Sequence, residues 1–180
     1  MTAAEDEFIA FADASAARLR RTAFLLCGDW HTAEDLTQTT LAKVFVAWRR
    51  INRQDAVHAY ATRTLVNTYL GEGRRRRPAE VLTSHPPERS AEQHSPELRM
   101  AVLDALAMLP PKSRAVVVLR YWADQSVEQV ATTLGCSTGN VKSQSARALA
   151  KLRELLDDAS GEPGPPATRT EALQQTGEPQ

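Results

Sequence analysis

Apolar residues in the first part of the chain recur at helical spacing, and runs of alternating apolar and polar residues are almost absent. The first helix should end at Gly28 and Asp29, a second should start near Thr32, and a third should run from about Asp55 to Leu70. In the first helix the periodic positions are Phe8, Phe11, Ala12, Ser15, Leu19, Ala23 and Leu26. In the second they are Ala33, Leu36, Thr40, Val44 and Trp48, with Leu41 and Phe45 beside them.

Between Pro78 and Pro96 the composition changes to proline, serine and charged residues without apolar periodicity, as is typical of a linker. A second helical block should open there, with Ser95 as the N-cap and Pro96 at the first helical position. The buried face of its first helix should comprise Leu98, Val102, Ala105, Leu106 and Leu109. A new helix should then begin at Pro111, and the helical pattern continues to about Leu156.

These patterns predict an all-α fold with two small helical domains joined by a flexible linker. The expected boundaries are residues 1–77 for the first domain, 78–96 for the linker and 97–157 for the second domain. Residues 158–180 carry too few apolar side chains to bury, so they are expected to form a disordered tail.

The second domain should end in a helix-turn-helix. Ser126 and Gln129 fit a capping box, Gly135 suits a left-handed C-cap, and Ser137 can cap the following helix. That last helix should bury Val141, Ala148 and Leu152, with Leu149 alongside. It should present Thr138, Asn140, Lys142, Ser143, Ala146 and Arg147 outward. Two helices joined by a tight glycine turn, the second with short polar and cationic side chains, indicate DNA binding.

The net charge of the whole chain is zero, so only the distribution of charge can indicate a nucleic-acid partner. In the last helix, Lys142, Arg147, Lys151 and Arg153 are followed by no acidic residue until Glu154. Cations at such a place can neutralise DNA phosphates, although a solvated helix face would carry them equally well. The turn residues, together with the cations, favour DNA binding.

Enzymatic, metal-binding and membrane functions find no support in the sequence. The two cysteines are far apart, which suggests neither a disulfide framework nor a zinc site, and the four histidines are scattered. The chain lacks a P-loop, and its N-terminus is acidic where a signal peptide would be basic. No apolar run approaches the ~18 residues of a membrane span. We therefore expect a cytosolic protein that is not an enzyme and needs no cofactor.

The two blocks together resemble a sigma factor of the sigma-70 family. The motif "AEDLTQ", Ala33 to Gln38, is similar to the helix that docks on the polymerase clamp. The segment "HAYATRTLVNTYL" with the arginine run after it resembles the promoter-melting segment, and "LPPKSRAVVVLRYW" resembles the start of the family's C-terminal domain. Because the chain has no room for the additional domains of a housekeeping sigma factor, it is identified with the extracytoplasmic-function group, which is bacterial.

The resemblance implies partners and site residues. Core RNA polymerase would be bound through the clamp of its β′ subunit and through its β subunit, with Asp35, Leu36 and Gln38 on the clamp-binding helix. An anti-sigma factor is an expectation for the whole group.

Promoter DNA would be read at two places. Asn67, with Tyr60, would read the melted −10 strand, and Arg74, Arg75, Arg76 and Arg77 would contact its phosphates. In the −35 duplex, Lys142, Ser143 and Ala146 would face bases, while Thr138, Asn140, Gln144 and Arg147 would hold phosphates. The implied function is promoter-specific transcription initiation.

Two other classes remain as alternatives to a sigma factor. One is a stand-alone helix-turn-helix regulator that binds operator DNA, and the other is an all-helical interaction protein such as a sigma antagonist. Neither of them needs the segment Ala33 to Gln38 or the segment around Asn67.

Overall fold

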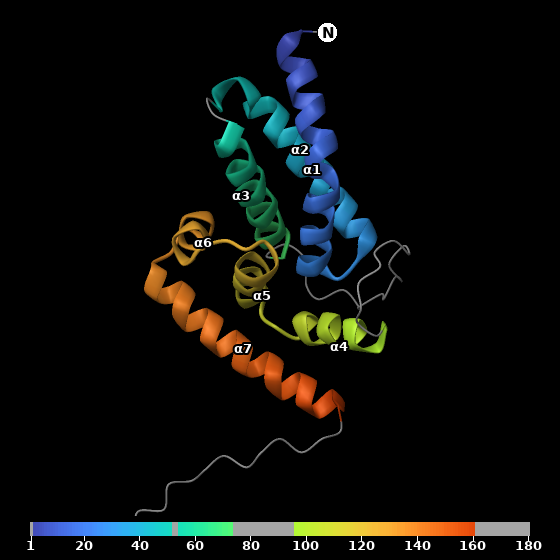
Figure 1. The fold of residues 1–180 in the computed structure, drawn as a ribbon, viewed down its shortest axis with the longest axis vertical. Coiled ribbons are helices and arrows are strands. Elements are labelled where there is room, and N and C mark those ends of the chain that lie inside the picture. Colours follow the sequence, from blue (N-terminus) through green and yellow to red (C-terminus); the bar gives the residue numbers. More distant parts are fainter. Residues whose placement is uncertain (1, 52–53, 74–95, 161–180) are drawn as a thin grey trace, which may run out of the picture.

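The computed structural model describes residues 2–51, 54–73 and 96–160, and all regular structure within these ranges is helical. The first block contains α1 (Ala3–Cys27), α2 (Trp30–Ala47), the 3₁₀ turn η1 (Trp48–Arg50) and α3 (Gln54–Gly73). The second contains α4 (Pro96–Ala107), α5 (Pro111–Val117), the π turn η2 (Val118–Trp122), α6 (Val127–Leu134) and α7 (Thr138–Ser160). The predicted all-α fold is confirmed (Figure 1). Two predicted features lie outside the described residues: positions 78–95 of the linker, with the cap Ser95, and the tail beyond Ser160.

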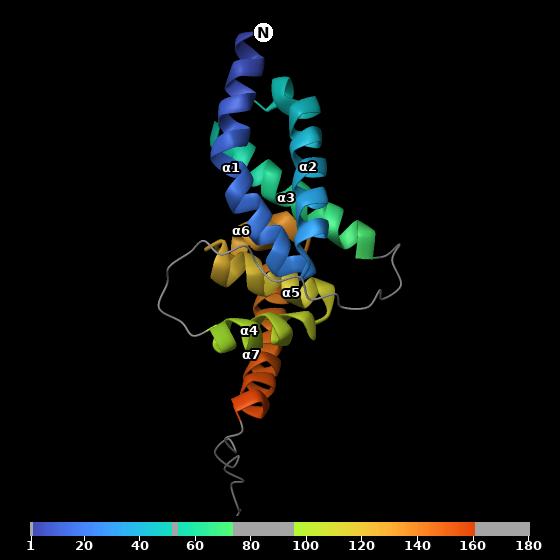
Figure 2. The ribbon, with the colours of Figure 1, turned by 90° about the vertical axis from the view of Figure 1, so that its right-hand side faces the viewer.

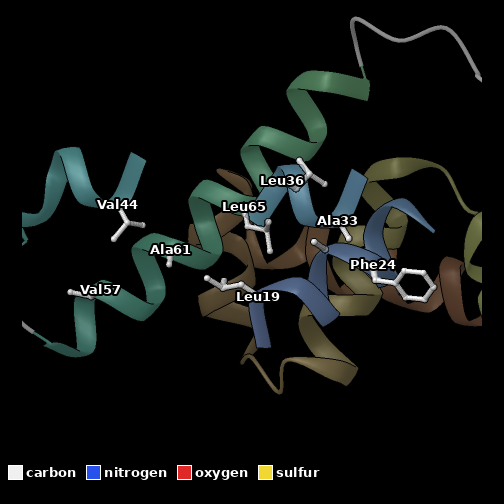
Figure 3. Close-up of a cluster of buried hydrophobic side chains, with 9 residues drawn as sticks. Leu19, Phe24, Ala33, Leu36, Val44, Val57, Ala61 and Leu65 are labelled. Carbon is white, nitrogen blue, oxygen red and sulfur yellow. The ribbon is translucent and has the colours of Figure 1, made fainter. Parts of the chain in front are cut away.

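The helices of the first block pack around one hydrophobic cluster. Leu19 of α1, Leu36 of α2 and Leu65 of α3 meet at its centre, and each is at most 3% exposed (Figure 3). At the far end, Phe8 packs on Phe45 with ring centroids 4.9 Å apart. Burial of one apolar stripe per helix therefore holds the block together, as the periodicity predicted.

The turn between α1 and α2 is built by two adjacent residues. Gly28 adopts φ 77°, a left-handed conformation that suits glycine, and its N–H bonds to the carbonyl of Phe24 at 2.7 Å. Asp29 then caps α2, because its carboxylate accepts from the N–H of Thr32 at 2.7 Å. Helix α2 consequently starts at Trp30, two residues before the predicted position.

The second block departs from the sequence prediction on α4. Of its expected buried face, Ala105, Leu106 and Leu109 are buried, but Leu98 is 48% exposed and Val102 is 37% exposed. The apolar side chains of α4 are therefore buried only toward its C-terminal end.

The local signals of the helix-turn-helix are confirmed. Ser126 and Gln129 form a reciprocal capping box, with bonds of 2.7 and 3.2 Å. Gly135 ends α6 with φ 63°, and the hydroxyl of Ser137 accepts from the N–H of Asn140 at 3.2 Å. The Ser126 and Gly135 caps fix the ends of α6, while Ser137 fixes the start of α7.

The π turn η2 was not predicted. The N–H of Ala123 bonds to the carbonyl of Val118 at 2.9 Å, five residues back, in place of the usual four. The wider turn ends this helical stretch and turns the chain toward α6.

The two blocks pack against each other. Views at right angles place α5 and α6 directly against the ends of α1 and α3 (Figures 1 and 2). Leu26 of α1 and Val66 of α3 are fully buried in the same cluster as Val116, Leu119 and Val130 of the second block. No helix among the described residues combines the length and hydrophobicity of a membrane span.

Cys27 allows a prediction about stability at alkaline pH. Burial raises the pKa of its thiol from 9.0 to about 11. The thiol donates a hydrogen bond to the carbonyl of Asp29 at 3.2 Å. A raised folded-state pKa stabilises the fold fully below about pH 9, and this contribution is lost as the pH rises through about 11. The free energy of unfolding should fall by about 2–3 kcal/mol more in the wild type than in Cys27→Ala over that range. Urea titrations at several pH values measure the free energy of unfolding of both proteins. If this free energy fell equally with pH in the two proteins, the raised pKa of Cys27 would be contradicted.

The turn at Gly135 allows a second prediction with an internal control. A Cβ on Gly135 would meet no atom within 4 Å, but its φ of 63° disfavours any side chain. Gly135→Ala should therefore destabilise the protein by roughly 1–2 kcal/mol. Gly139, in the first turn of α7, has no left-handed φ, and a Cβ there would make only an ordinary contact, 3.9 Å from the Oγ of Ser137, so Gly139→Ala should stabilise by roughly 0.5–1 kcal/mol. Thermal unfolding of both variants checks the opposite signs.

Candidate functional site

The segment Ala33 to Gln38 of α2 divides into an exposed and a buried part. Asp35 and Gln38 are exposed on one side of the helix. Leu36 lies between them in sequence but is 1% exposed and packs in the cluster with Leu19 and Leu65. The side chain of Leu36 therefore offers no surface to a partner, and it contributes by fixing the helix from beneath.

The acids of α2 differ in their surroundings. The carboxylate of Glu34 pairs with Arg20 at 3.4 Å and accepts from the amide of Gln38 at 3.4 Å. The guanidinium of Arg20 also lies 5.9 Å from the ring centre of Trp30. Asp35 has no hydrogen bond or ion pair within the described part of the chain, so its carboxylate is available to a basic partner.

The exposed face of α2 continues into an apolar end that the sequence reading missed. Asp35, Gln38, Ala42 and Phe45 recur at intervals of three and four residues, and all four are exposed. Phe45 is 49% exposed and its neighbour Val46 is 83% exposed. The helical spacing that joins Asp35 and Gln38 extends to Ala42 and Phe45, so the sequence pattern alone could have predicted that these residues share the exposed face. We call Asp35, Gln38, Ala42, Phe45 and Val46 the α2 face.

A second exposed face lies on α3. Tyr60, Arg63 and Asn67 follow one another at helical spacing, and all three are exposed, Tyr60 to 38%. The amide of Asn67 has no hydrogen bond to another described residue. The opposite side of the helix is anchored in the core through Val57, Ala61 and Leu65. The helix thus presents a ring, a cation and an amide together, and we call Tyr60, Arg63 and Asn67 the α3 face.

The predicted arginine contacts follow directly after this helix. Arg74, Arg75, Arg76 and Arg77 lie outside the described residues.

The third face belongs to α7, the second helix of the helix-turn-helix (Figure 1). Val141 and Ala148 are buried as predicted, and they seat the helix on the block. The outward positions are exposed, and Gln144 is half-buried. We call this set the α7 face; it comprises Thr138, Asn140, Lys142, Ser143, Gln144, Ala146 and Arg147.

Hydrogen bonds order part of the α7 face. The amide of Gln144 donates to the side-chain oxygen of Asn140 at 2.7 Å, and the Nε of Arg147 donates to the carbonyl of Ser143 at 3.3 Å. Side chains held in this way lose less entropy when they bind a ligand.

Two acids modify the charge of this region, and sequence order alone did not reveal that Glu128 lies near it. Glu128 of α6 is fully exposed, and its pKa is lowered by its own backbone N–H, by the hydroxyl of Ser126 and, more weakly, by Lys142. Glu154 pairs with Lys151 at 3.0 Å. Among the cations of the described part of α7, Arg147 and Arg153 thus have no acid at ion-pair distance. Lys142 retains its exposure, with Glu128 nearby on another helix.

Metal-binding geometry is not found in the described ranges, where no three His, Cys, Asp or Glu side chains gather at one place. The candidate site consists of three exposed helical faces. In each case the opposite side of the same helix is apolar and buried.

Comparison with family models matches both blocks. The model described as "Sigma-70 region 2" matches residues 11–78, and the model described as "Sigma-70, region 4" matches residues 99–152. The α2 and α3 faces fall within the first match, and the α7 face falls within the second.

Individual relatives agree with these matches. The chain is 42% identical over 142 residues to an RNA polymerase sigma-E factor of Streptomyces coelicolor, covering 77% of this chain and 79% of the relative. It is 33% identical over 156 residues to the ECF RNA polymerase sigma factor SigL of Mycobacterium tuberculosis, covering 81% and 86%.

A solved structure resembles the whole fold. It contains the sigma factor RpoE in complex with the anti-sigma factor NepR from Bartonella quintana. The TM-score is 0.72 at 26% identity, and the match covers 84% of this chain and 97% of that one. The chain belongs to the sigma-70 family, in its extracytoplasmic-function group, and is a sigma factor that binds core RNA polymerase and directs promoter-specific transcription initiation.

Proposed function

We propose that the α2, α3 and α7 faces divide the work of this sigma factor between polymerase binding, reading of the −10 strand and reading of the −35 duplex. The observation that supports this division is that each face is exposed and carries polar side chains, while the same helix is anchored by a buried apolar face. Rigid helices present side chains to a large partner with less loss of entropy than loops do.

The α2 face binds the clamp of the polymerase β′ subunit. Asp35 supplies an unpaired carboxylate and Gln38 an amide, which suit basic and polar groups of a helical partner. Phe45 and Val46 supply apolar area that is already outside the core and gains burial on docking. The second block contacts the β subunit.

The α3 face reads the melted −10 strand. The amide of Asn67 can donate to and accept from the edge of an unpaired base, and the ring of Tyr60 can stack on one. Arg63 and the run Arg74 to Arg77 supply phosphate contacts that do not depend on sequence.

The α7 face reads the −35 duplex in its major groove. Lys142, Ser143 and Ala146 lie toward base edges, and the small side chains of Ser143 and Ala146 allow the helix to approach closely. Thr138, Asn140, Gln144 and Arg147 hold the phosphates on either side.

No catalytic role is part of this proposal, because the three faces only bind. The chain works in the bacterial cytoplasm, where polymerase and promoter DNA are found. An anti-sigma factor restrains it; the solved relative in complex with NepR supports this regulation.

Charge reversal on the α2 face tests polymerase binding. Asp35→Arg should weaken binding to sigma-free core RNA polymerase at least about tenfold, because a like charge facing a basic partner costs several kcal/mol. Asp13→Arg, which reverses an equally exposed acid on α1, is the matched control and should bind normally. Co-elution on a sizing column and a titration with labelled core measure the difference. If both variants or neither lost binding, the α2 face would not be the docking surface.

Neutral substitutions on α7 test promoter reading. Lys142→Ala should cost ~1–3 kcal/mol on the preferred −35 sequence and broaden the preference. Lys151→Ala is the control, because Lys151 already pairs with Glu154 and, about two and a half turns further along the helix, lies on the opposite side of it from Lys142. The holoenzyme would select from duplexes randomised at the −35 element, and sequencing would give the preference. An unchanged preference in Lys142→Ala would exclude Lys142 from base reading.

A further inference from the structure

An acidic side chain lies beside the residues that the α7 face offers to DNA. Glu128 belongs to the first turn of α6, the helix that precedes α7 in the helix-turn-helix, and it is fully exposed. A carboxylate at this place repels DNA phosphates and therefore weakens binding to DNA of any sequence. The division of work proposed above gives Glu128 no role, so its effect on the α7 face needs an explanation.

The geometry of the turn brings Glu128 toward α7. Glu128 on α6 and Thr138 on α7 line the same shallow hollow, with Gly135 of the turn between them in sequence. Val130 of α6 and Val141 of α7 are both fully buried in one hydrophobic cluster, which fixes the two helices against each other. The position of Glu128 relative to the first turns of α7 is therefore set by the core.

Lys142 lies on the same side of α7 as this hollow. It follows Thr138 by four residues, so the two exposed side chains are neighbours on one side of the helix. The pKa of Glu128 is lowered first by its own backbone N–H and by the hydroxyl of Ser126, and then by the charges of Lys142 and Arg120. Glu128 is thus an ionised carboxylate near two cations.

The two cations differ in their freedom. Arg120 is half-buried, donates from one guanidinium nitrogen to the carbonyl of Gln125 and lies 5.7 Å from the ring centre of Tyr121. Lys142 is exposed and makes no hydrogen bond to another residue that the structure describes. The ammonium of Lys142 can therefore move between the carboxylate, a phosphate and a base edge, whereas Arg120 is held in place.

We propose that Glu128 is a specificity-determining residue, which acts through Lys142 by keeping its ammonium from binding phosphates while leaving it able to bind a base. The proposal deepens the function proposed above and rests on it, because it requires the α7 face to read the −35 duplex. In a helix-turn-helix the first helix crosses the DNA backbone while the second lies in the major groove. A carboxylate on α6 therefore stands between Lys142 and the phosphates.

The charge of the DNA group explains why the two kinds of contact respond differently. A phosphate is an anion, so the carboxylate of Glu128 repels it and competes with it for Lys142. The acceptor atoms on a base edge are neutral, and a lysine has three donors, so Lys142 can bind a base while it remains beside Glu128. Specificity is a difference of affinities, and Glu128 increases it by weakening the complexes that consist of phosphate contacts alone.

Holoenzyme binding to two labelled duplexes tests this role. One duplex carries the −35 sequence selected by the wild-type holoenzyme, and the other carries the same bases in scrambled order. Because Glu128 is fully exposed, Glu128→Gln should keep the fold while removing the charge. Its Kd for the scrambled duplex should fall about two- to fivefold, which is the range expected for an exposed charge pair. The Kd for the selected duplex should change less, so the ratio of the two Kd values should fall.

Salt dependence gives a second readout. With Lys142 released to a phosphate, the logarithm of the affinity of Glu128→Gln for the scrambled duplex should fall more steeply with the logarithm of salt concentration, by about 0.9 in slope. Glu154→Gln removes another exposed acid, one that pairs with Lys151, and should leave the ratio of the Kd values unchanged. A change of the same size on both duplexes in Glu128→Gln would overturn the proposal.

A double-mutant cycle shows whether Glu128 acts through Lys142. In the Lys142→Ala background, Glu128→Gln should no longer lower the ratio of the Kd values. If it lowered the ratio there as much as in the wild type, an action through Lys142 would be excluded.

The same cycle separates this proposal from the proposed function. If Lys142→Ala alone left the ratio unchanged, base reading by Lys142 would fail and the role of Glu128 would fail with it. If Lys142→Ala lowered the ratio and Glu128→Gln did not, reading of the −35 duplex would stand and only the role of Glu128 would be overturned.

Discussion

Burial of Leu26 and Val66 in the cluster around Val116 and Val130 is the contact on which the arrangement of the whole molecule depends. Each block is small, and small helical domains bury a limited fraction of their apolar surface when they are alone. By placing two side chains of the first block in the core of the second, the chain extends its hydrophobic core across the boundary. The carbonyl of Leu26 receives a hydrogen bond from Arg114 in the same place, so that helix end is satisfied as well.

Each of these helices has two roles, since one side packs in a core and another side is exposed. On α2, Ala33, Leu36 and Val44 are buried while Asp35 and Gln38 are exposed one position away. Helix α3 uses three directions, since Leu65 points into its own block, Val66 into the neighbouring block and Asn67 into solvent. One helix therefore joins the core of the first block, the core shared with the second block and an exposed face.

The fold determines which charged side chains form pairs, whereas the composition gives only their numbers. The chain has equal numbers of acidic and basic residues, and net charge alone suggests no partner. Folding pairs Glu34 with Arg20 and brings Glu128 near Lys142, while Asp35 and Arg147 stay free of ion pairs within the described ranges. The unpaired charges, rather than the net charge, separate a surface suited to a basic protein partner from one suited to DNA.

Local structure was determined by the sequence itself. The capping box of Ser126 and Gln129 and the left-handed turn at Gly135 involve residues at most five positions apart, so short-range sequence patterns encode them. Motifs around Asp35, Asn67 and Lys142 likewise located the faces that the structure exposes, because helical spacing alone separates outward from inward positions.

Only the tertiary structure decided which apolar side chains are covered and by what. Leu98 and Phe45 share the apolar character of their buried neighbours but remain about half exposed, although Phe8 of α1 packs on the ring of Phe45. Leu36 lies within the motif Ala33 to Gln38 yet is buried, because α1 and α3 pack against it. The bond from Arg114 to Leu26 joins residues 88 positions apart, and no local pattern can encode a contact that depends on how two blocks pack.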